Sequence, residues 1–139
     1  MTAGTCFAPV PYRSDHLDTP VRDFMSPGVL TLVEDASLGH VLHAMRCHRV
    51  HAVVVSGRET GAPLGWVTTR GLLAWIDRDH SLAVARDAIT EPAVTIEPAA
   101  TIREAVALLT REHVGRLLVA HRPDTMPEGV VAELDLLGV

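Results

Sequence analysis

An internal repeat constrains this sequence more than any other feature. Residues 22–75 align without a gap onto residues 86–139, and many paired positions keep their apolar character. Identical residues occur along the whole alignment, among them Arg22/Arg86, Thr31/Thr95, Val50/Val114, Gly65/Gly129 and Leu72/Leu136. One copy is too short to bury an apolar face by itself. The duplication therefore predicts two similar units that pack on each other.

Each repeat shows the same order of predicted elements. A short strand comes first, at 29–33 and 93–97, and an amphipathic helix follows, at 38–48 and 102–113. Two further strands are predicted in each repeat, at 52–55 and 64–68 and at 116–120 and 129–133. A second helix begins near Thr69, and a shorter piece begins near Leu134. The order β-α-β-β-α, present twice, predicts an α/β fold with helices covering sheets.

Capping residues and proline positions set the predicted boundaries. Ser37 and Thr101 are the expected N-caps of the long helices, and Thr101 with Glu104 fits the capping-box pattern. Residues 1–20 contain three prolines without sustained periodicity, which predicts an extended arm. We therefore expect an arm at 1–20, repeat 1 at 21–76, a linker at 77–85 and repeat 2 at 86–139.

Composition excludes several classes of function. The formal net charge is -5 and all 12 basic residues are arginine, which excludes a Schiff-base lysine and a Walker-A lysine. An acidic chain without a basic stripe is a poor nucleic-acid binder. The sequence holds no common catalytic motif, so we do not expect an enzyme.

Apolar runs and cysteine usage set the expected location. No apolar run reaches the roughly 20 residues that a membrane-spanning helix needs, and no leader peptide is visible. Cys6 and Cys47 do not make a disulfide framework. These features predict a cytoplasmic protein without a membrane partner.

Histidine and cysteine residues line one side of the first long helix. His40, His43 and Cys47 are spaced i, i+3 and i+7, opposite the apolar face. One ion cannot reach all three, because seven residues of helix rise about 10 Å. A solvated histidine-rich face, or a face packed against a second subunit, is the simpler interpretation, and no metal site is assigned. A metal-responsive protein remains a third alternative.

The repeats resemble a pair of cystathionine-β-synthase (CBS) domains, the arrangement called a Bateman module. The motif that opens the family's domain is similar to residues 21–27 (VRDFMSP), and the strand that follows is similar to 94–96. Residues 48–55 resemble the family's histidine-containing strand. The family's G-h-h-T-x-x-D run is matched by residues 65–71 and 129–135. The resemblance covers about residues 21–139 and implies repeats related by a pseudo-two-fold axis.

The resemblance also implies where a ligand would bind. Several family members bind adenosine-containing ligands between the repeats, where a carboxylate accepts from the ribose hydroxyls and a threonine holds phosphate. On this pattern Asp135 marks the better cleft, and the other expected ligand-binding residues are Val94 and Thr95 for the base, His51 and Arg116 for phosphate, and Thr68. Asp135 could instead be a helix N-terminal acid, Thr68 a cap, and Arg116 a surface residue or an ion-pair partner.

Neither repeat carries the whole motif. Repeat 1 keeps Thr68 but has Gly71 where the aspartate belongs, whereas repeat 2 keeps Asp135 but has Ala132 in place of the hydroxyl. We expect the cleft at Gly71 to be empty or weak. The resemblance thus implies a regulatory homodimer that needs no cofactor and binds an adenosine-type ligand. The alternative is a ligand-free oligomerisation or protein-interaction module with degenerate nucleotide motifs.

Overall fold

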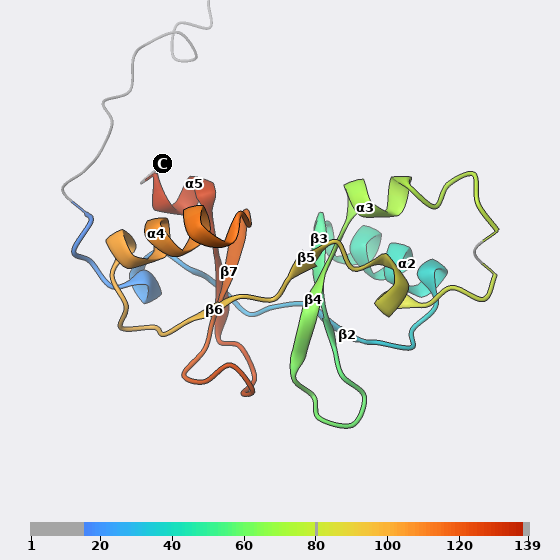
Figure 1. The fold of residues 1–139 in the computed structure, drawn as a ribbon, viewed down its shortest axis with the longest axis horizontal. Coiled ribbons are helices and arrows are strands. Elements are labelled where there is room, and N and C mark those ends of the chain that lie inside the picture. The colour runs from blue at the N-terminus through green and yellow to red at the C-terminus, as the bar shows by residue number, and fades with distance from the viewer. Residues whose placement is uncertain (1–15, 80, 138–139) are drawn as a thin grey trace, which may run out of the picture.

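A computed structural model describes residues 16–79 and 81–137 of the chain. Most of the predicted arm, with Cys6, lies outside these residues, as does the end of repeat 2 after residue 137. The described chain forms two four-stranded sheets with helices on their outer sides, so the predicted α/β class is confirmed (Figure 1). The sheets lie toward the middle of the molecule and the helices lie on its two flanks.

The main elements of the two repeats correspond one to one. Repeat 1 contains β2 (Thr31–Val33), α2 (Leu38–His48), β3 (Ala52–Ser56), β4 (Pro63–Thr68) and α3 (Thr69–Leu73). Repeat 2 contains β6 (Thr95–Ile96), α4 (Ile102–Glu112), β7 (Arg116–Val119), β8 (Gly129–Ala132) and α5 (Glu133–Leu136). A short 3₁₀ turn and a two-residue strand precede each set of elements. They are η1 (Val21–Asp23) and β1 (Ser26–Pro27) before β2, and η2 (Ala85–Ala88) and β5 (Glu91–Pro92) before β6.

Local sequence signals explain the ends of the long helices. The hydroxyl of Ser37 accepts from the His40 N–H, and Thr101 and Glu104 form a reciprocal capping box, which confirms both predicted caps. Each helix ends at a left-handed residue, Arg49 or His113, so α4 stops one residue earlier than predicted. Both residues have a positive φ without being glycine, a conformation that terminates the helical hydrogen-bond ladder.

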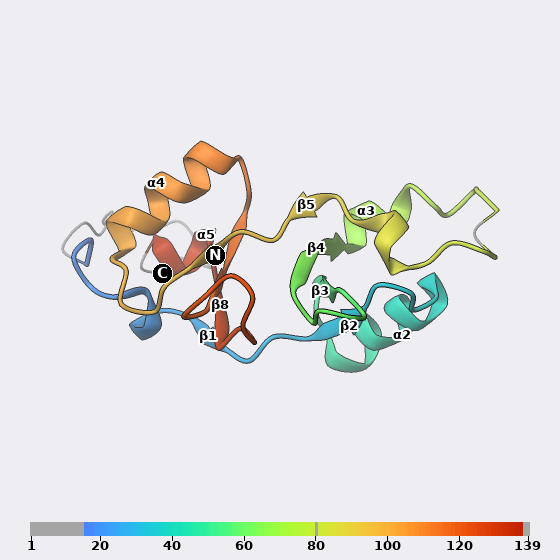
Figure 2. The same cartoon turned by 60° about the horizontal axis from the view of Figure 1, so that its bottom comes forward.

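The two short strands β1 and β5 are exchanged between the repeats. β1 precedes the elements of repeat 1 but pairs antiparallel with β8 of repeat 2, whereas β5 precedes those of repeat 2 but pairs antiparallel with β4. Both sheets consequently have the same strand order, β2-β3-β4-β5 and β6-β7-β8-β1. Figure 2 shows β1 beside β8. The pattern of apolar residues did not predict these strands, because two residues are too few to show a period.

The segments around these strands, residues 20–27 and 84–91, are called the leading segments below. Each leading segment docks on the opposite repeat through equivalent backbone hydrogen bonds. The Val21 N–H donates to Ala100 O at 2.8 Å, and the Ala85 N–H donates to Ala36 O at 2.7 Å. Val21 is fully buried in the core of repeat 2, and Ala85 is fully buried in the core of repeat 1. Each core is therefore completed by residues that precede the other repeat.

This exchange explains why β2 and β6 are shorter than predicted. The residues just before them carry the chain from one sheet to the other, so only Thr31–Val33 and Thr95–Ile96 pair as regular strands. A third apolar cluster joins the two sheets where they face each other. Its buried members are Val54, Trp66 and Leu118, one strand residue from each of β3, β4 and β7.

Replacing Gly65 tests the exchange directly. A Cβ at this position would lie 2.8 Å from Glu91 O of the exchanged strand and would also collide with the Ile89 side chain. We expect Gly65→Ala to lower the free energy of unfolding by about 1–3 kcal/mol, the usual cost of overpacking. Urea unfolding followed by circular dichroism measures the change.

Gly39→Ala is the matched control. Gly39 lies in the first turn of α2, where the nearest atom to a new Cβ is 4.0 Å away. Alanine there is expected to raise stability by about 0.5–1 kcal/mol, because it favours the helix more than glycine does. Equal effects of the two substitutions would show that β5 does not lie against β4.

Candidate functional site

The two motif residues Thr68 and Asp135 each hold the start of a short helix. In repeat 1, the Gly71 N–H donates to Thr68 Oγ1 at 3.0 Å. In repeat 2, the Ala132 N–H donates to Asp135 Oδ2 at 2.8 Å. A complete capping box makes both bonds, so each repeat retains one half of the box. Both residues therefore cap the start of a helix, which is the alternative role that the sequence predicts for them.

The structure divides the six predicted ligand-binding residues between the two repeats. His51 and Thr68 belong to repeat 1, where His51 O accepts from the Thr69 N–H at 2.9 Å and the His51 side chain is exposed. The other four belong to repeat 2, namely Val94, Thr95, Arg116 and Asp135. Within repeat 2, Arg116 is paired with Ala132, the residue whose N–H is held by Asp135. Arg116 and Asp135 therefore lie at the same end of one sheet.

The two residues predicted to contact the base, Val94 and Thr95, lie just before and at the start of β6, the edge strand of the repeat 2 sheet. Val94 O accepts from the Leu118 N–H at 2.9 Å, and the Val94 side chain packs against the core of repeat 2. Thr95 is paired with Leu118, and both residues are on the face of the sheet that is turned toward repeat 1, because side chains alternate along a strand.

Arg116 forms an ion pair that links the two sheets. Its Nη1 lies 3.0 Å from Glu91 Oε2, and the side chains are 27% and 26% exposed. The guanidinium also lies over the Trp66 ring, with Cζ 5.4 Å from the ring centroid. Glu91 belongs to the exchanged strand of the repeat 1 sheet, whereas Arg116 begins β7 of the repeat 2 sheet. This outcome matches the ion-pair interpretation of Arg116.

Two buried polar atoms on the face of the repeat 1 sheet have no hydrogen-bond partner among the described residues. They are Thr31 Oγ1 and Trp66 Nε1. Thr31 and Trp66 are both paired with Val54, from opposite sides, so they lie in one row across the sheet. An unpaired buried donor raises the free energy of the folded state by about 1–3 kcal/mol. The junction between the repeats therefore offers hydrogen-bonding capacity that the protein does not use itself.

A cavity of about 450 Å³ opens beside the motif of repeat 1. Thr68 and Gly71 line one wall, and Asp87, Thr90 and Glu91 of the leading segment line the other. Of the six predicted residues, Thr68 is the one that lines this cavity. A Cβ at position 71 would lie 3.0 Å from Thr90 Cγ2, so the family's aspartate would crowd Thr90.

The leading-segment residues of this cavity were missed by sequence reasoning. Asp87, Thr90 and Glu91 precede repeat 2 in sequence, but they contribute to a wall of repeat 1 because β5 is exchanged. These residues could have been assigned to the repeat 1 cavity only if the pairing of β5 with β4 had been known. Asp87 is also occupied locally, because its Oδ2 accepts from the Val84 N–H at 2.9 Å.

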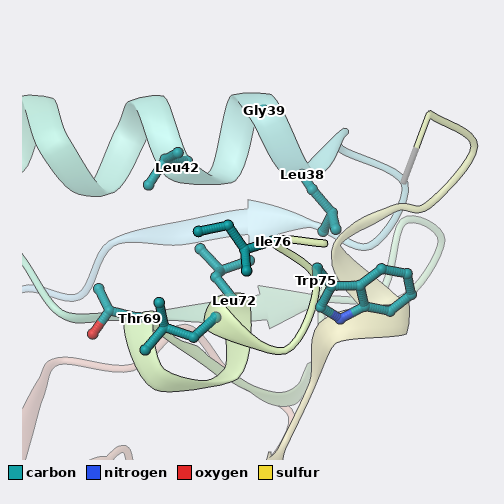
Figure 3. A pocket seen from close by; sticks show the side chains of 8 residues that line it. Leu38, Gly39, Leu42, Thr69, Leu72, Trp75 and Ile76 are labelled. Carbon is teal, nitrogen blue, oxygen red and sulfur yellow. The ribbon is translucent and has the colours of Figure 1, made fainter. Parts of the chain in front are cut away.

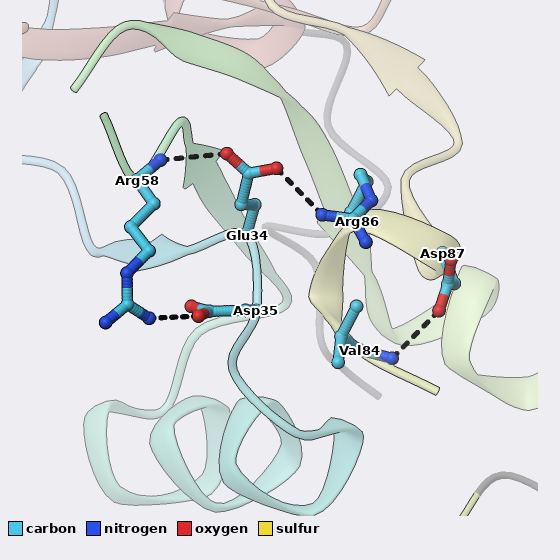
Figure 4. A network of polar contacts seen from close by, with 6 residues as sticks. All are labelled: Glu34, Asp35, Arg58, Val84, Arg86 and Asp87. Atoms are coloured by element: carbon cyan, nitrogen blue, oxygen red, sulfur yellow. Dashed lines mark hydrogen bonds and ion pairs between the residues drawn. The ribbon is translucent and has the colours of Figure 1, made fainter. Parts of the chain in front are cut away.

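A polar network ties the second leading segment to repeat 1 (Figure 4). Glu34 Oε2 accepts from the Arg58 N–H at 2.8 Å, and Glu34 Oε1 accepts from Arg86 Nη1 at 2.8 Å. Arg58 also pairs with Asp35. The bond from the Arg58 N–H, with that from Arg86, holds the pKa of Glu34 below its ordinary value. The network borders a polar cavity of about 490 Å³.

Two absences concern the described residues only. Across residues 16–79 and 81–137, no group of three or more His, Cys, Asp or Glu side chains is arranged to hold a metal ion. In the same part of the chain, no helix has the length and apolar character to cross a bilayer.

Comparison with known proteins gives a consistent picture. The sequence profile of the CBS domain matches residues 21–78 and 85–139. An uncharacterized 33.4 kDa protein in a ribosomal RNA operon of Thermofilum pendens is 28% identical over 84% of this chain. The chain spans 42% of the length of that relative.

Solved structures show the same fold. The CBS domain of a bacterial CNNM/CorC family Mg²⁺ transporter, solved in complex with ATP, has a TM-score of 0.75 and 22% identity, covering 88% of this chain and 87% of that one. A CBS domain protein from Pyrobaculum aerophilum, complexed with AMP, has a TM-score of 0.70 and 18% identity, covering 84% and 88%.

Replacing Glu34 tests the polar network through pH. A carboxyl group whose pKa is lowered on folding stabilises the protein above its unfolded pKa of about 4.3, and this stabilisation is lost as the pH falls through the folded value. We expect Glu34→Gln to unfold at a lower temperature than wild type at pH 7. The difference should shrink as the pH falls below about 4.3.

Thermal unfolding between pH 3 and pH 7 measures this effect. Arg86→Gln removes one of the two partners of Glu34 and keeps the bond from the Arg58 N–H, so its effect should be smaller. A difference between wild type and Glu34→Gln that stays constant with pH would contradict the assigned network.

Proposed function

Because this chain belongs to the CBS-domain family and carries two CBS domains, we propose that it binds an adenosine-type ligand, of the AMP, ATP or S-adenosylmethionine class, in a cleft between its repeats. CBS-domain pairs are regulatory modules and not enzymes in themselves. Two structural neighbours described above were solved with AMP or ATP, which supports this ligand class. The chain itself would act by sensing the ligand, without catalysis and without a resident cofactor.

The observation that carries the proposal is the shared position of Arg116 and Asp135. The two residues lie at one end of the repeat 2 sheet, joined through Ala132. Asp135 Oδ2 caps the helix, and a carboxylate has capacity for further bonds from both ribose hydroxyls. Arg116 supplies a cation for phosphate. Thr95 and Val94 remain the proposed residues toward the base, with His51 as a phosphate contact from repeat 1. Thr68 lines the other cavity, beside Gly71, and is the proposed phosphate contact there.

Glu91 gives this site a means of regulation. In the present structure Glu91 holds Arg116, so a ligand phosphate competes with Glu91 for the guanidinium. Binding would exchange an ion pair between the repeats for one with the ligand. The equilibrium between the two arrangements shifts only by the difference in the ligand's affinity for them.

The cleft beside Thr68 should bind more weakly. Gly71 supplies no carboxylate for the ribose, and two acidic residues, Asp87 and Glu91, line the cavity against one arginine, Arg70. A lost charge-assisted hydrogen bond weakens binding by about 1.5–3 kcal/mol, which is more than tenfold in affinity.

Titration with AMP, ATP and S-adenosylmethionine tests the proposed ligand class. At about 100 times its dissociation constant, a ligand raises the free energy of unfolding by about 2.7 kcal/mol. Calorimetry and thermal unfolding of the full chain should show this effect for at least one of the three compounds. No effect with any of them would contradict the proposed function.

Variants of the same chain locate the site. Asp135→Asn keeps an oxygen that can cap Ala132 but removes the charge, and we expect at least tenfold weaker binding. Glu91→Gln frees Arg116 and should strengthen binding. Asp124→Asn, an exposed acid in the β7–β8 loop, is the control. Binding that Asp135→Asn leaves unaltered would refute the site assignment even where the ligand is correct.

The second candidate function is self-association, which an apolar groove on the helical flank of repeat 1 favours. The groove has a volume of about 370 Å³ and lies between α2 and α3 (Figure 3). Its lining is almost wholly apolar and includes Leu38, Leu42, Leu72, Trp75 and Ile76. Exposed apolar side chains on a helical face mark an interaction surface.

A second copy of this chain is the occupant that the sequence repeat favours. Leu42 and Leu73 on the flank of repeat 1 correspond to Val106 and Leu137 in repeat 2, and all four are exposed. The two flanks therefore present apolar side chains at the same positions. In a symmetric homodimer, the apolar flanks of one copy would pack against the same flanks of the second copy.

Replacing Leu73 tests self-association. Leu73 is 62% exposed on the flank, whereas Leu82, in the linker, is 93% exposed away from the groove. We expect light scattering to give a dimer mass for wild type and Leu82→Glu, and a monomer mass for Leu73→Glu, because a carboxylate would be desolvated in the interface. A wild-type monomer, or a dimer unaffected by Leu73→Glu, would contradict the homodimer.

A further inference from the structure

Two potential metal ligands meet on the solvent side of α2. His43 and Cys47 are four residues apart, which places them one above the other on the helix surface. His43 Nε2 and Cys47 Sγ form a hydrogen bond at 3.4 Å, and both side chains are exposed. Cys47 is a free cysteine. Neither residue contributes to the apolar cores or to the ligand-binding site proposed above.

The separation of these two atoms matches the edge of a tetrahedral metal site. An ion bound at about 2.3 Å from a thiolate sulfur and about 2.0 Å from an imidazole nitrogen holds the two atoms about 3.5 Å apart. The observed separation is 3.4 Å and is that of a hydrogen bond, so an ion that replaces the bridging proton would need little change in the spacing of the two donors. His40 lies seven residues from Cys47, roughly 10 Å along the helix, and cannot reach the same ion.

The chemistry of the donors selects the class of ion. Thiolate and imidazole favour zinc and similar transition metals over Mg²⁺ and Ca²⁺, which prefer oxygen. The pair lies in the second half of α2, where the helix dipole favours a cation. Arg46 and Arg49 on the same turn oppose this effect by repulsion, so the ligand bonds must provide the affinity.

We propose that His43 and Cys47 form a two-ligand surface site for a zinc-like divalent ion, with water completing the tetrahedron. Water can fill the remaining positions because both side chains face solvent. The thiol loses its proton when the ion binds, so binding should release protons and weaken as the pH falls. This site is independent of the nucleotide cleft, and the failure of either proposal leaves the other standing.

Cobalt substitution tests the proposal on the full, tag-free chain. The Cys6→Ser variant is the background, because it leaves Cys47 as the only thiol. Titration with Co²⁺ should produce a thiolate-to-cobalt charge-transfer absorption that saturates at one ion per chain, and Zn²⁺ should abolish it by competition. Absence of this absorption would overturn the proposal.

Substitutions on the same helix identify the ligands. In the Cys6→Ser background, Cys47→Ser should abolish the absorption, and His43→Ala should weaken Co²⁺ binding at least tenfold. His40→Ala is the matched control, because it removes a neighbouring histidine that cannot reach the ion. Circular dichroism checks that each variant is folded. Equal losses in His40→Ala and His43→Ala would overturn the assigned pair, and one ion per two chains would overturn the water-completed site.

Discussion

The reciprocal exchange of the two leading segments is the interaction on which this structure depends. The segment before repeat 1 completes the sheet and core of repeat 2, and the segment before repeat 2 completes those of repeat 1. Each segment also donates backbone hydrogen bonds to the residues ahead of the opposite long helix. The two repeats therefore stabilise each other through the backbone as well as through the apolar cluster around Val54, Trp66 and Leu118. A motion of one leading segment changes the packing of the other repeat.

This arrangement gives the Glu91–Arg116 ion pair its importance. Glu91 is anchored in the repeat 1 sheet by the pairing of β5 with β4, whereas Arg116 begins a central strand of the repeat 2 sheet. A group that draws Arg116 away from Glu91 acts at once on both sheets. Exposed ion pairs contribute little to stability, but this pair is about three-quarters buried and lies over Trp66. The proposed exchange of this pair for a ligand phosphate would therefore have a larger effect than the exchange of a surface pair.

The repeat, the order of main elements and the helix caps could be predicted from the sequence because each rests on local signals. Apolar periodicity defines α2 and α4, and the hydroxyls of Ser37 and Thr101 mark where they begin. The exchange of β1 and β5 could not be predicted, because two-residue strands have no period and either sheet could accept them. Because the exchange of β5 could not be predicted, Asp87, Thr90 and Glu91 were not assigned to the cleft wall. The family resemblance named Thr68 and Asp135, and the alternative roles that the sequence predicts for them, a cap and a helix N-terminal acid, agree with their hydrogen bonds to Gly71 and Ala132.

The divided capping box explains how the motif could lose one residue in each repeat without loss of the fold. The first backbone N–H groups of a helix need an acceptor, and more than one kind of side chain can supply it. Thr68 does so for α3 and Asp135 does so for α5. Capping alone therefore requires one member of the pair and does not distinguish which. A ribose does distinguish them, because a carboxylate accepts from both ribose hydroxyls and a single threonine hydroxyl cannot do so as strongly. Capping alone does not require a carboxylate in the repeat whose sheet also carries Arg116, whereas the proposed ligand site does.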